Sequence, residues 1–142
     1  MRKFKIEDSL GFIINKVNGK LKNELYQELK EYDITPEQWA VLNFLWEGDG
    51  VTPKELADLT FKDKSNTNRI LDNLQKKGLI IRSPHPTDGR AFLVFLTDAG
   101  KGLRENLIPK AISLLEKATR QIDEEKIKKM KLLLNQIYIN LM

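Results

Sequence analysis

Hydrophobic residues recur at steps of three and four near both ends of the chain, which predicts long amphipathic helices there. The first helix ends near Glu31 and carries its apolar residues on one face: Leu10, Ile14, Val17, Leu21, Leu25 and Leu29. The last helix has a heptad-like seam: Ile127, Met130, Leu134, Ile137 and Leu141. Further apolar residues lie off that seam: Leu132, Leu133, Tyr138 and Ile139. A helix that is apolar around much of its girth needs more than one neighbour.

Two shorter helices are predicted from a repeated start signal. Thr35-Pro36-Glu37-Gln38 and Thr52-Pro53-Lys54-Glu55 each place a hydroxyl at the N-cap and proline at the first helical position. In each, the threonine oxygen can accept from the third residue, whose Gln or Glu side chain can reach back. We expect the first helix to stop before Gly48 and the second near Thr60.

A third helix is predicted from Lys64 to Lys77, capped by Asp63 and ended by Gly78. Its large apolar residues all lie in its second half: Ile70, Leu71 and Leu74. The helix is therefore expected to be anchored by its C-terminal half and to present its polar N-terminal half outward.

A β-hairpin is predicted next, with strands at residues 79–82 and 91–96. The intervening tip has two prolines and an Asp-Gly pair, which favour turns. Thr97 then caps a long helix that reaches Ala118. The predicted fold class is mainly α with a small β-hairpin wing: a winged helix-turn-helix with N- and C-terminal dimerisation helices.

The composition excludes several classes of protein. With 142 residues the chain is long enough for a single domain with one core. It has no cysteine and one histidine, His85, so we expect no disulfide, no metal site and no cofactor. It also lacks a glycine-rich phosphate loop and a nucleophile–base pair at a recognisable spacing, so we do not expect an enzyme. Without a membrane-length apolar run or a signal-peptide pattern, a cytoplasmic location is expected.

Positive charge is concentrated in one part of the chain. Seven basic and three acidic residues lie between Lys62 and Arg90, an excess equal to the formal net charge of +4, and the rest of the chain is balanced. This segment covers the third short helix and the hairpin. A local excess of this kind points to a polyanion, and double-stranded DNA is the partner that fits a helix-helix-hairpin order.

The residue types of this segment suit both base and phosphate contacts. Side chains at the start of the helix can pair with base edges in the major groove: Ser65, Asn66, Thr67, Asn68 and Arg69. Four lysines suit phosphates: Lys62, Lys64, Lys76 and Lys77. Arg90 at the hairpin tip can reach the minor groove. The alternative is that the polar half of the helix is simply a solvated face, and that the last lysines only complement the helix dipole.

The chain resembles the MarR (multiple antibiotic resistance regulator) family over nearly its entire length. The most specific segments are R-I-L-D-N-L-x-x-K-G-L-I-x-R, from Arg69 to Arg82, and D-G-R-x-x-x-V-x-L-T-x-x-G, from Asp88 to Gly100. The resemblance implies a single domain, 1–142, with a winged lobe at 35–97. The segments 1–32 and 98–142 would be the dimerisation helices of a homodimer.

The resemblance also implies functional residues and partners. Ser65 to Arg69 fall on the recognition helix, Asp88 and Arg90 on the family's wing Asp-x-Arg, and Arg82 on the basic residue that opens the wing. Family members mostly repress transcription from pseudo-palindromic sites, and many release DNA on binding small aromatic or phenolic effectors. Such ligands sit between the dimer helices and the winged lobe, where Phe12, Tyr32 and Trp39 are aromatic candidates. Plain core packing is the alternative for those three.

The sequence departs from the family pattern in two places. Thr67 and Asn68 stand where the family more often has an apolar residue followed by Thr or Ser. Thr67 is therefore expected to weaken the anchoring of that turn or to alter base preference. The absence of cysteine excludes the branch of the family that senses peroxides by thiol oxidation.

Two alternative readings stay open at this level. The same fold can serve as a protein-interaction module that docks an acidic partner without binding DNA. The terminal helices can also pack only on each other within one chain. That arrangement leaves much apolar surface for a lobe of this size, so dimerisation is the favoured interpretation.

Overall fold

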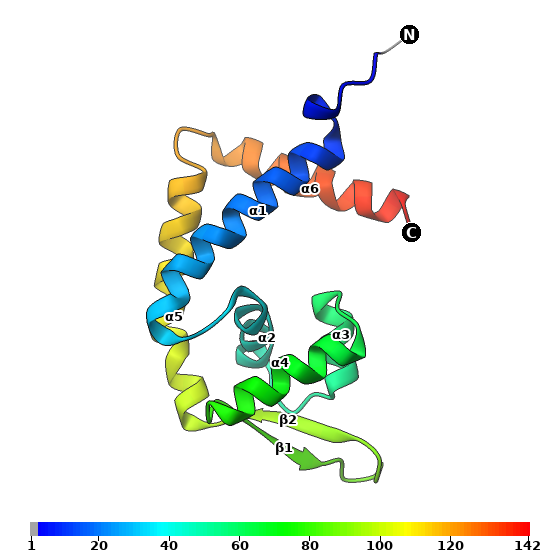
Figure 1. Cartoon of the computed structure of the whole chain (residues 1–142), viewed down its shortest axis with the longest axis vertical. Helices are drawn as coiled ribbons and strands as arrows, with labels where there is room; N and C mark the ends of the chain where they lie inside the picture. The colour runs from blue at the N-terminus through cyan, green and yellow to red at the C-terminus, as the bar shows by residue number, and fades with distance from the viewer. Residues whose placement is uncertain (1–2) are drawn as a thin grey trace.

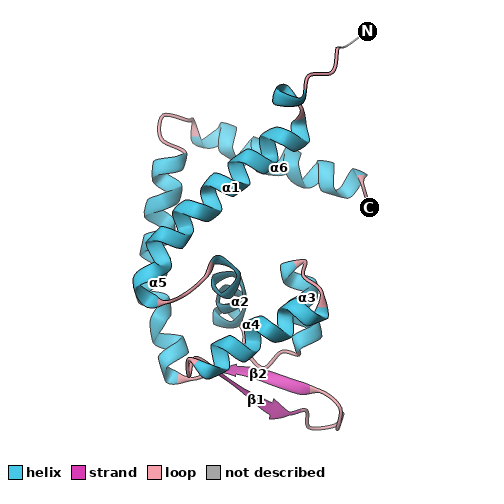
Figure 2. Ribbon diagram, in the orientation of Figure 1, coloured by secondary structure: helices cyan, strands magenta, loops and turns pink. Residues whose placement is uncertain are grey.

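The computed structural model describes residues 3–142 and is mainly helical, with one two-stranded hairpin (Figures 1 and 2). Met1 and Arg2, which open the predicted dimerisation segment 1–32, lie outside the described residues. The elements are η1 (Ile6–Asp8), α1 (Leu10–Leu29), η2 (Lys30–Tyr32), α2 (Pro36–Glu47), α3 (Pro53–Thr60), α4 (Lys64–Lys76), β1 (Ile80–Pro84), β2 (Phe92–Leu96), α5 (Asp98–Ala118) and α6 (Glu124–Asn140).

The two ends of the molecule are built from different helices and strands. Helices α2, α3 and α4 gather with the hairpin at one end, and we call this group the winged lobe, residues 36–96. Helix α1 packs against α5, and α5 in turn packs against α2 and β2. Figure 1 shows α6 at the end of the molecule away from the hairpin, with both chain termini on that side. The predicted winged helix-turn-helix fold is confirmed.

Local capping explains where the helices of the winged lobe begin. At α2 the predicted capping box is complete: Gln38 N–H donates to Thr35 Oγ1 at 3.1 Å, and Thr35 N–H donates to Gln38 Oε1 at 3.2 Å. Thr52 and Asp63 accept the corresponding N–H at the starts of α3 and α4, at 3.1 and 2.7 Å. Within residues 3–142, the return hydrogen bond, from the N-cap N–H to the side chain three residues later, therefore forms at α2 and not at α3.

The junction between α4 and β1 differs slightly from the prediction. Gly78 has φ +74°, and its N–H donates to Gln75 O, while Leu79 N–H donates to Leu74 O at 3.0 Å. This is the double hydrogen bond of a Schellman motif, which needs a left-handed residue at the glycine position. Because Leu79 N–H closes the helix end, β1 begins at Ile80 rather than at Leu79.

The hairpin pairs β1 and β2 in antiparallel register, from Ile80 opposite Leu96 to Pro84 opposite Phe92. Strand β2 starts one residue later than predicted, and β1 extends two residues further. Helix α5 follows directly, capped by Thr97, whose Oγ1 accepts from Gly100 N–H at 3.1 Å. A Cβ on Gly100 would lie 2.2 Å from the carbonyl oxygen of Leu79, so only glycine permits this approach of α5 to the hairpin.

The core lies inside the winged lobe and under its contacts with α1 and α5. It includes Leu29, Val41, Leu42, Leu45, Leu56, Leu71, Leu74, Val94 and Leu107, all at most 1% exposed. Trp46 packs edge-on against Trp39 and donates its indole N–H to Gly100 O at 2.9 Å. These contacts make the lobe and the start of α5 one packed unit.

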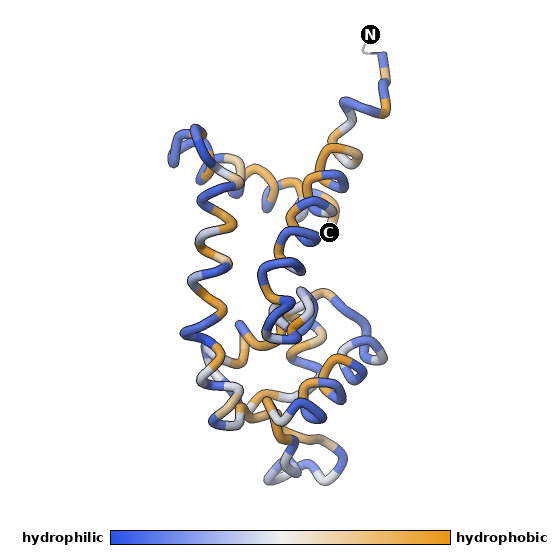
Figure 3. Tube along the Cα trace, turned by 60° about the vertical axis from the view of Figure 1, so that its left-hand side comes forward, coloured by the Kyte–Doolittle hydropathy of each residue, from blue (hydrophilic) through white to orange (hydrophobic). Residues whose placement is uncertain are grey.

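The opposite end of the molecule has a large exposed apolar surface. No residue of α6 is buried, and on α1 the only buried residue is Leu29 at its end. Figure 3 shows apolar positions recurring along both helices. Across residues 3–142, no helix combines the length and the apolar character needed to cross a membrane.

Candidate DNA-binding surface

Helix α4 is held by its C-terminal half. Ile70, Leu71 and Leu74 are at most 5% exposed and belong to the core. Four predicted contact residues lie on the other side and are exposed: Lys64, Ser65, Asn66 and Arg69. Asn68 is half-buried and Lys76 is exposed. The helix therefore presents a polar surface on an anchored scaffold, as the sequence predicted.

Thr67 differs from this expectation. Its side chain is only 1% exposed, and its hydroxyl donates to Asp63 O at 2.9 Å, one turn back on the helix. Thr67 was predicted to face outward with the base-contacting residues, and that placement is wrong. A short β-branched residue fits the core here because its hydroxyl bonds to its own helix, so the turn is packed rather than loosened.

The exposed residues at the start of α4 form a chain of hydrogen bonds. Asn66 Nδ2 donates to Asp63 Oδ2 at 3.2 Å, and Arg69 Nη2 donates to Asn66 Oδ1 at 3.0 Å. The amide and the guanidinium are thus oriented without DNA. Both groups have further donors or acceptors free to meet base edges.

Lys62 lies behind the start of α4 rather than on its outer face. It is half-buried and lines two pockets beside α2, both of which it shares with Glu37. Glu37 forms an ion pair with Lys22 of α1, at 2.6 Å. Burial alone would raise the pKa of Glu37, but the hydrogen bond from Lys22, a backbone hydrogen bond and the charges of Lys22 and Lys62 lower it overall.

Arg82 has partners on its own chain. Its guanidinium forms an ion pair with Asp72 and donates from Nε to Gln75 Oε1 at 2.9 Å. Its side chain is 22% exposed. Arg82 was predicted as a DNA contact that opens the wing; its position instead fastens β1 to the exposed face of α4. Sequence reasoning missed Asp72 and Gln75, although their i, i+3 spacing on one helix face was a usable signal.

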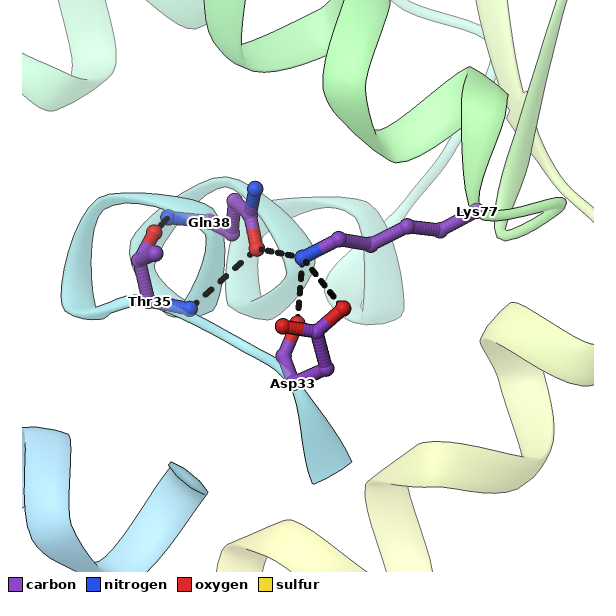
Figure 4. Close-up of polar contacts among 4 residues, drawn as sticks. All are labelled: Asp33, Thr35, Gln38 and Lys77. Atoms are coloured by element: carbon purple, nitrogen blue, oxygen red, sulfur yellow. Dashed lines mark hydrogen bonds and ion pairs between the residues drawn. The ribbon is translucent and has the colours of Figure 1, made fainter. Parts of the chain in front are cut away.

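Lys77 is also occupied within the chain (Figure 4). Its ammonium donates to the carbonyl oxygen of Asp33 and, at 2.9 Å, to Gln38 Oε1, and it lies 3.6 Å from the Asp33 carboxylate. Asp33 has φ +55°, which turns its carbonyl toward α4. Lys77 was expected to suit phosphates, but it joins the end of α4 to the α1–α2 connection. Lys76, its neighbour, remains exposed.

The wing tip presents Arg90. Asp88 and Arg90 are both exposed, and Arg90 N–H donates to Asp88 Oδ1 at 3.0 Å. The backbone of Arg90 is thus held by the aspartate two residues earlier, while the hydrogen bonds described for Arg90 leave its guanidinium available. Exposed arginine side chains thus stand on both the wing, at Arg90, and α4, at Arg69.

A pocket of about 430 Å³ lies where α1, α2 and α5 meet. Its apolar wall includes Leu21, Leu25, Trp39, Leu114 and Leu115, and its polar edge includes Lys22, Glu37 and Lys62. Of the three aromatic candidates, Trp39 lines this pocket. Tyr32 instead lies beneath the ammonium of Lys110, 5.8 Å from the ring centroid, and Phe12 is exposed on α1.

Comparison with known proteins agrees with this geometry. A family model described as "MarR family" matches residues 32–91. The multiple antibiotic resistance protein MarR of Escherichia coli strain K12 is 38% identical over 96 residues, which are 68% of this chain and 67% of that protein. A crystal structure of a MarR mutant from E. coli with operator DNA superposes with a TM-score of 0.85 at 31% identity, covering 90% of this chain and 92% of that one.

A second DNA complex is similar in fold. The Staphylococcus aureus MepR–DNA complex superposes with a TM-score of 0.87 at 25% identity, covering 93% of this chain and 98% of that one. The family model covers the winged lobe up to the residue before β2, and the solved structures extend the similarity over β2 and the terminal helices. The chain therefore belongs to the MarR family of DNA-binding transcriptional regulators.

Proposed function

We propose that this protein is a homodimeric repressor that reads a pseudo-palindromic operator with α4 and the β1–β2 wing. The observation that carries the proposal is the anchored α4, with exposed Asn66 and Arg69 on its outer face and exposed Arg90 on the wing beside it. Solved structures of similar chains with DNA support the DNA-binding part. A DNA-binding role also fits the cytoplasmic location expected from the sequence.

The contacts divide into two kinds. Ser65, Asn66, Asn68 and Arg69 are assigned to base edges, and Lys64, Lys76 and Arg90 to phosphates or the minor groove. Thr67 is left out because it is buried, and Arg82 and Lys62 are assigned supporting roles because they are held within the protein. In a dimer, two such surfaces would meet half-sites about one helical turn apart, roughly 34–36 Å.

A fluorescence-anisotropy titration over a salt series tests the proposal. The probe is a duplex from the region upstream of the protein's own operon, with an unrelated duplex as competitor. The logarithm of the affinity should fall with the logarithm of salt concentration, by about 0.9 per neutralised phosphate. If no binding occurs, or if salt has no effect on affinity, the proposal fails. The alternative is that this surface docks an acidic protein without binding DNA. That alternative is favoured if unrelated duplex DNA fails to displace such a protein from this chain.

Single substitutions separate the two kinds of contact. Arg90→Ala should weaken binding across all sequences, whereas Asn68→Ala should relax the preference at one base position by about 1–3 kcal/mol. Lys20→Ala is the control, because Lys20 is an exposed α1 residue paired with Glu24. Equal affinity of Arg90→Ala and Lys20→Ala would contradict the assignment of the wing.

We further propose that the pocket bounded by α1, α2 and α5 takes a small aromatic or phenolic effector that releases DNA. Its volume of about 430 Å³ lies within the range typical of small-molecule sites, and an apolar wall with a few polar groups suits such a ligand. A screen of aromatic and phenolic compounds for release of the labelled duplex would test it. Trp39→Leu should abolish the response of an active compound while the protein still binds DNA.

A further inference from the structure

The ring of His85 organises the wing tip. Its Nδ1 atom lies 3.2 Å from the backbone nitrogen of Thr87 and 3.1 Å from that of Asp88. Backbone N–H groups only donate, so both bonds require an unprotonated Nδ1 that accepts. In the structure His85 is half-buried, and its ring accepts from two consecutive backbone amides.

These bonds are continuous with the one that holds Arg90. Asp88 donates its N–H to His85 and accepts the Arg90 N–H on Oδ1, at 3.0 Å. Two backbone hydrogen bonds close the loop: His85 N–H donates to Ala91 O at 3.0 Å, and Ala91 N–H donates to Asp88 O at 3.2 Å. The conformation of the segment that presents Arg90 thus depends on an acceptor at position 85.

The geometry is that of a side-chain turn normally made by Asn or Asp. Those residues accept the N–H groups two and three positions later with a side-chain oxygen, and here an imidazole nitrogen stands in its place. Pro86 lies between His85 and the two amides and has no N–H to compete for the ring. The arrangement therefore requires a hydrogen-bond acceptor at position 85 and not a positive charge.

We propose that His85 is a positioning residue for DNA binding: its unprotonated Nδ1 holds the wing tip in the form that presents Arg90. This inference rests on the proposed role of the wing in binding DNA. Protonation of Nδ1 would set a third N–H against two N–H donors and would break both bonds. His85 would then act through Arg90 and would not itself touch DNA.

A matched pair of substitutions in the full-length protein tests the role. His85→Asn keeps an acceptor near the position of Nδ1, and His85→Leu has the same branching without one. In anisotropy titrations with the upstream duplex, His85→Leu should bind roughly three- to tenfold more weakly and His85→Asn within about twofold of the wild type. Equal losses in the two variants, at equal melting temperatures, would overturn the proposal.

A double-mutant cycle shows whether His85 acts through Arg90. His85→Leu should cause no further loss of affinity in an Arg90→Ala background. Additive losses would mean that His85 contributes directly and would contradict its role as a positioning residue. If Arg90→Ala binds like the wild type, the proposed role of the wing fails instead.

One further readout does not depend on the substitutions. In the free protein, a long-range ¹H–¹⁵N NMR spectrum should show His85 with an unprotonated Nδ1 and a protonated Nε2; the opposite tautomer would overturn the proposal whether or not the wing binds DNA.

Discussion

At the scale of single residues, Lys76 and Lys77 show how neighbours of the same type take different roles. Lys77 is directed back across the end of α4 to Asp33 and Gln38, and Lys76 remains exposed. Successive helix positions are about 100° apart, so one side chain can face the α1–α2 connection while the next faces solvent. The sequence places the two lysines side by side, and only their partners separate them.

We therefore expect Lys77→Met to lower the free energy of unfolding by about 1–3 kcal/mol, because Gln38 and the Asp33 carbonyl lose a charged donor. Lys76→Met should stay within about 0.5 kcal/mol of the wild type. It should instead remove about one phosphate contact, which lowers the slope of log affinity against log salt concentration by about 0.9. Urea unfolding and salt titrations of both variants check this. Equal stability of the two would show that the Lys77 contacts contribute nothing.

At the scale of elements, ion pairs join helices to their neighbours, and two of these pairs lie beside the proposed functional surfaces. Lys22 of α1 pairs with Glu37 in the first turn of α2, and Asp72 of α4 pairs with Arg82 of β1. The first lies at the edge of the pocket, and the second supports the wing. Both are partly screened from water, so each is expected to matter more than the exposed pairs along single helices.

The Glu37 pair gives a pH-dependent prediction. The folded-state pKa of Glu37 is lowered from 4.5, so its contribution to stability is present above that value and is lost as the pH falls through the lowered one. In Lys22→Met the hydrogen bond and the charge of Lys22 are lost, so the pKa of Glu37 should rise relative to the wild type and this acid-dependent contribution should shrink. Unfolding free energies measured from neutral to acidic pH check it. Lys20→Met, which removes the exposed pair with Glu24, should keep the wild-type profile.

At the scale of the whole molecule, the terminal helices are not covered within one chain. Leu132 is 71% exposed and Ile139 57%, and they lie seven residues apart on one face of α6. An exposed apolar surface of this extent is typical of a subunit interface. The homodimer proposed above would cover it with a second copy of the same helices.

Light scattering at micromolar concentration should give twice the chain mass of 16.4 kDa. Leu132→Asp combined with Ile139→Asp should shift the protein to the monomer mass, because two carboxylates cannot be buried against apolar helices without a large cost. DNA affinity should fall with it. Leu59→Asp, at an exposed position on α3, serves as the control. A wild-type protein that is monomeric under these conditions would refute the dimer.

Much of the fold could be predicted because its signals are local. Helix starts depend on Thr35, Asp63 and similar caps acting over three residues, and the glycine after α4 ends that helix through its own backbone angle. Periodicity identified the core half of α4, and charge counting located the basic segment. The strand ends were less accurate by one or two residues, and at the start of β1 the reason is that Leu79 N–H closes the end of α4.

The sequence by itself thus determined the fold class, the order of elements and the segment that carries the positive charge. Only the tertiary structure decided which of the polar residues in that segment are free. Thr67 is buried, Arg82 and Lys77 are held by residues seven to 44 positions away, and His85 is an acceptor within a folded loop. These outcomes depend on contacts between distant segments, and side-chain type alone does not record whether a partner stands within hydrogen-bonding distance.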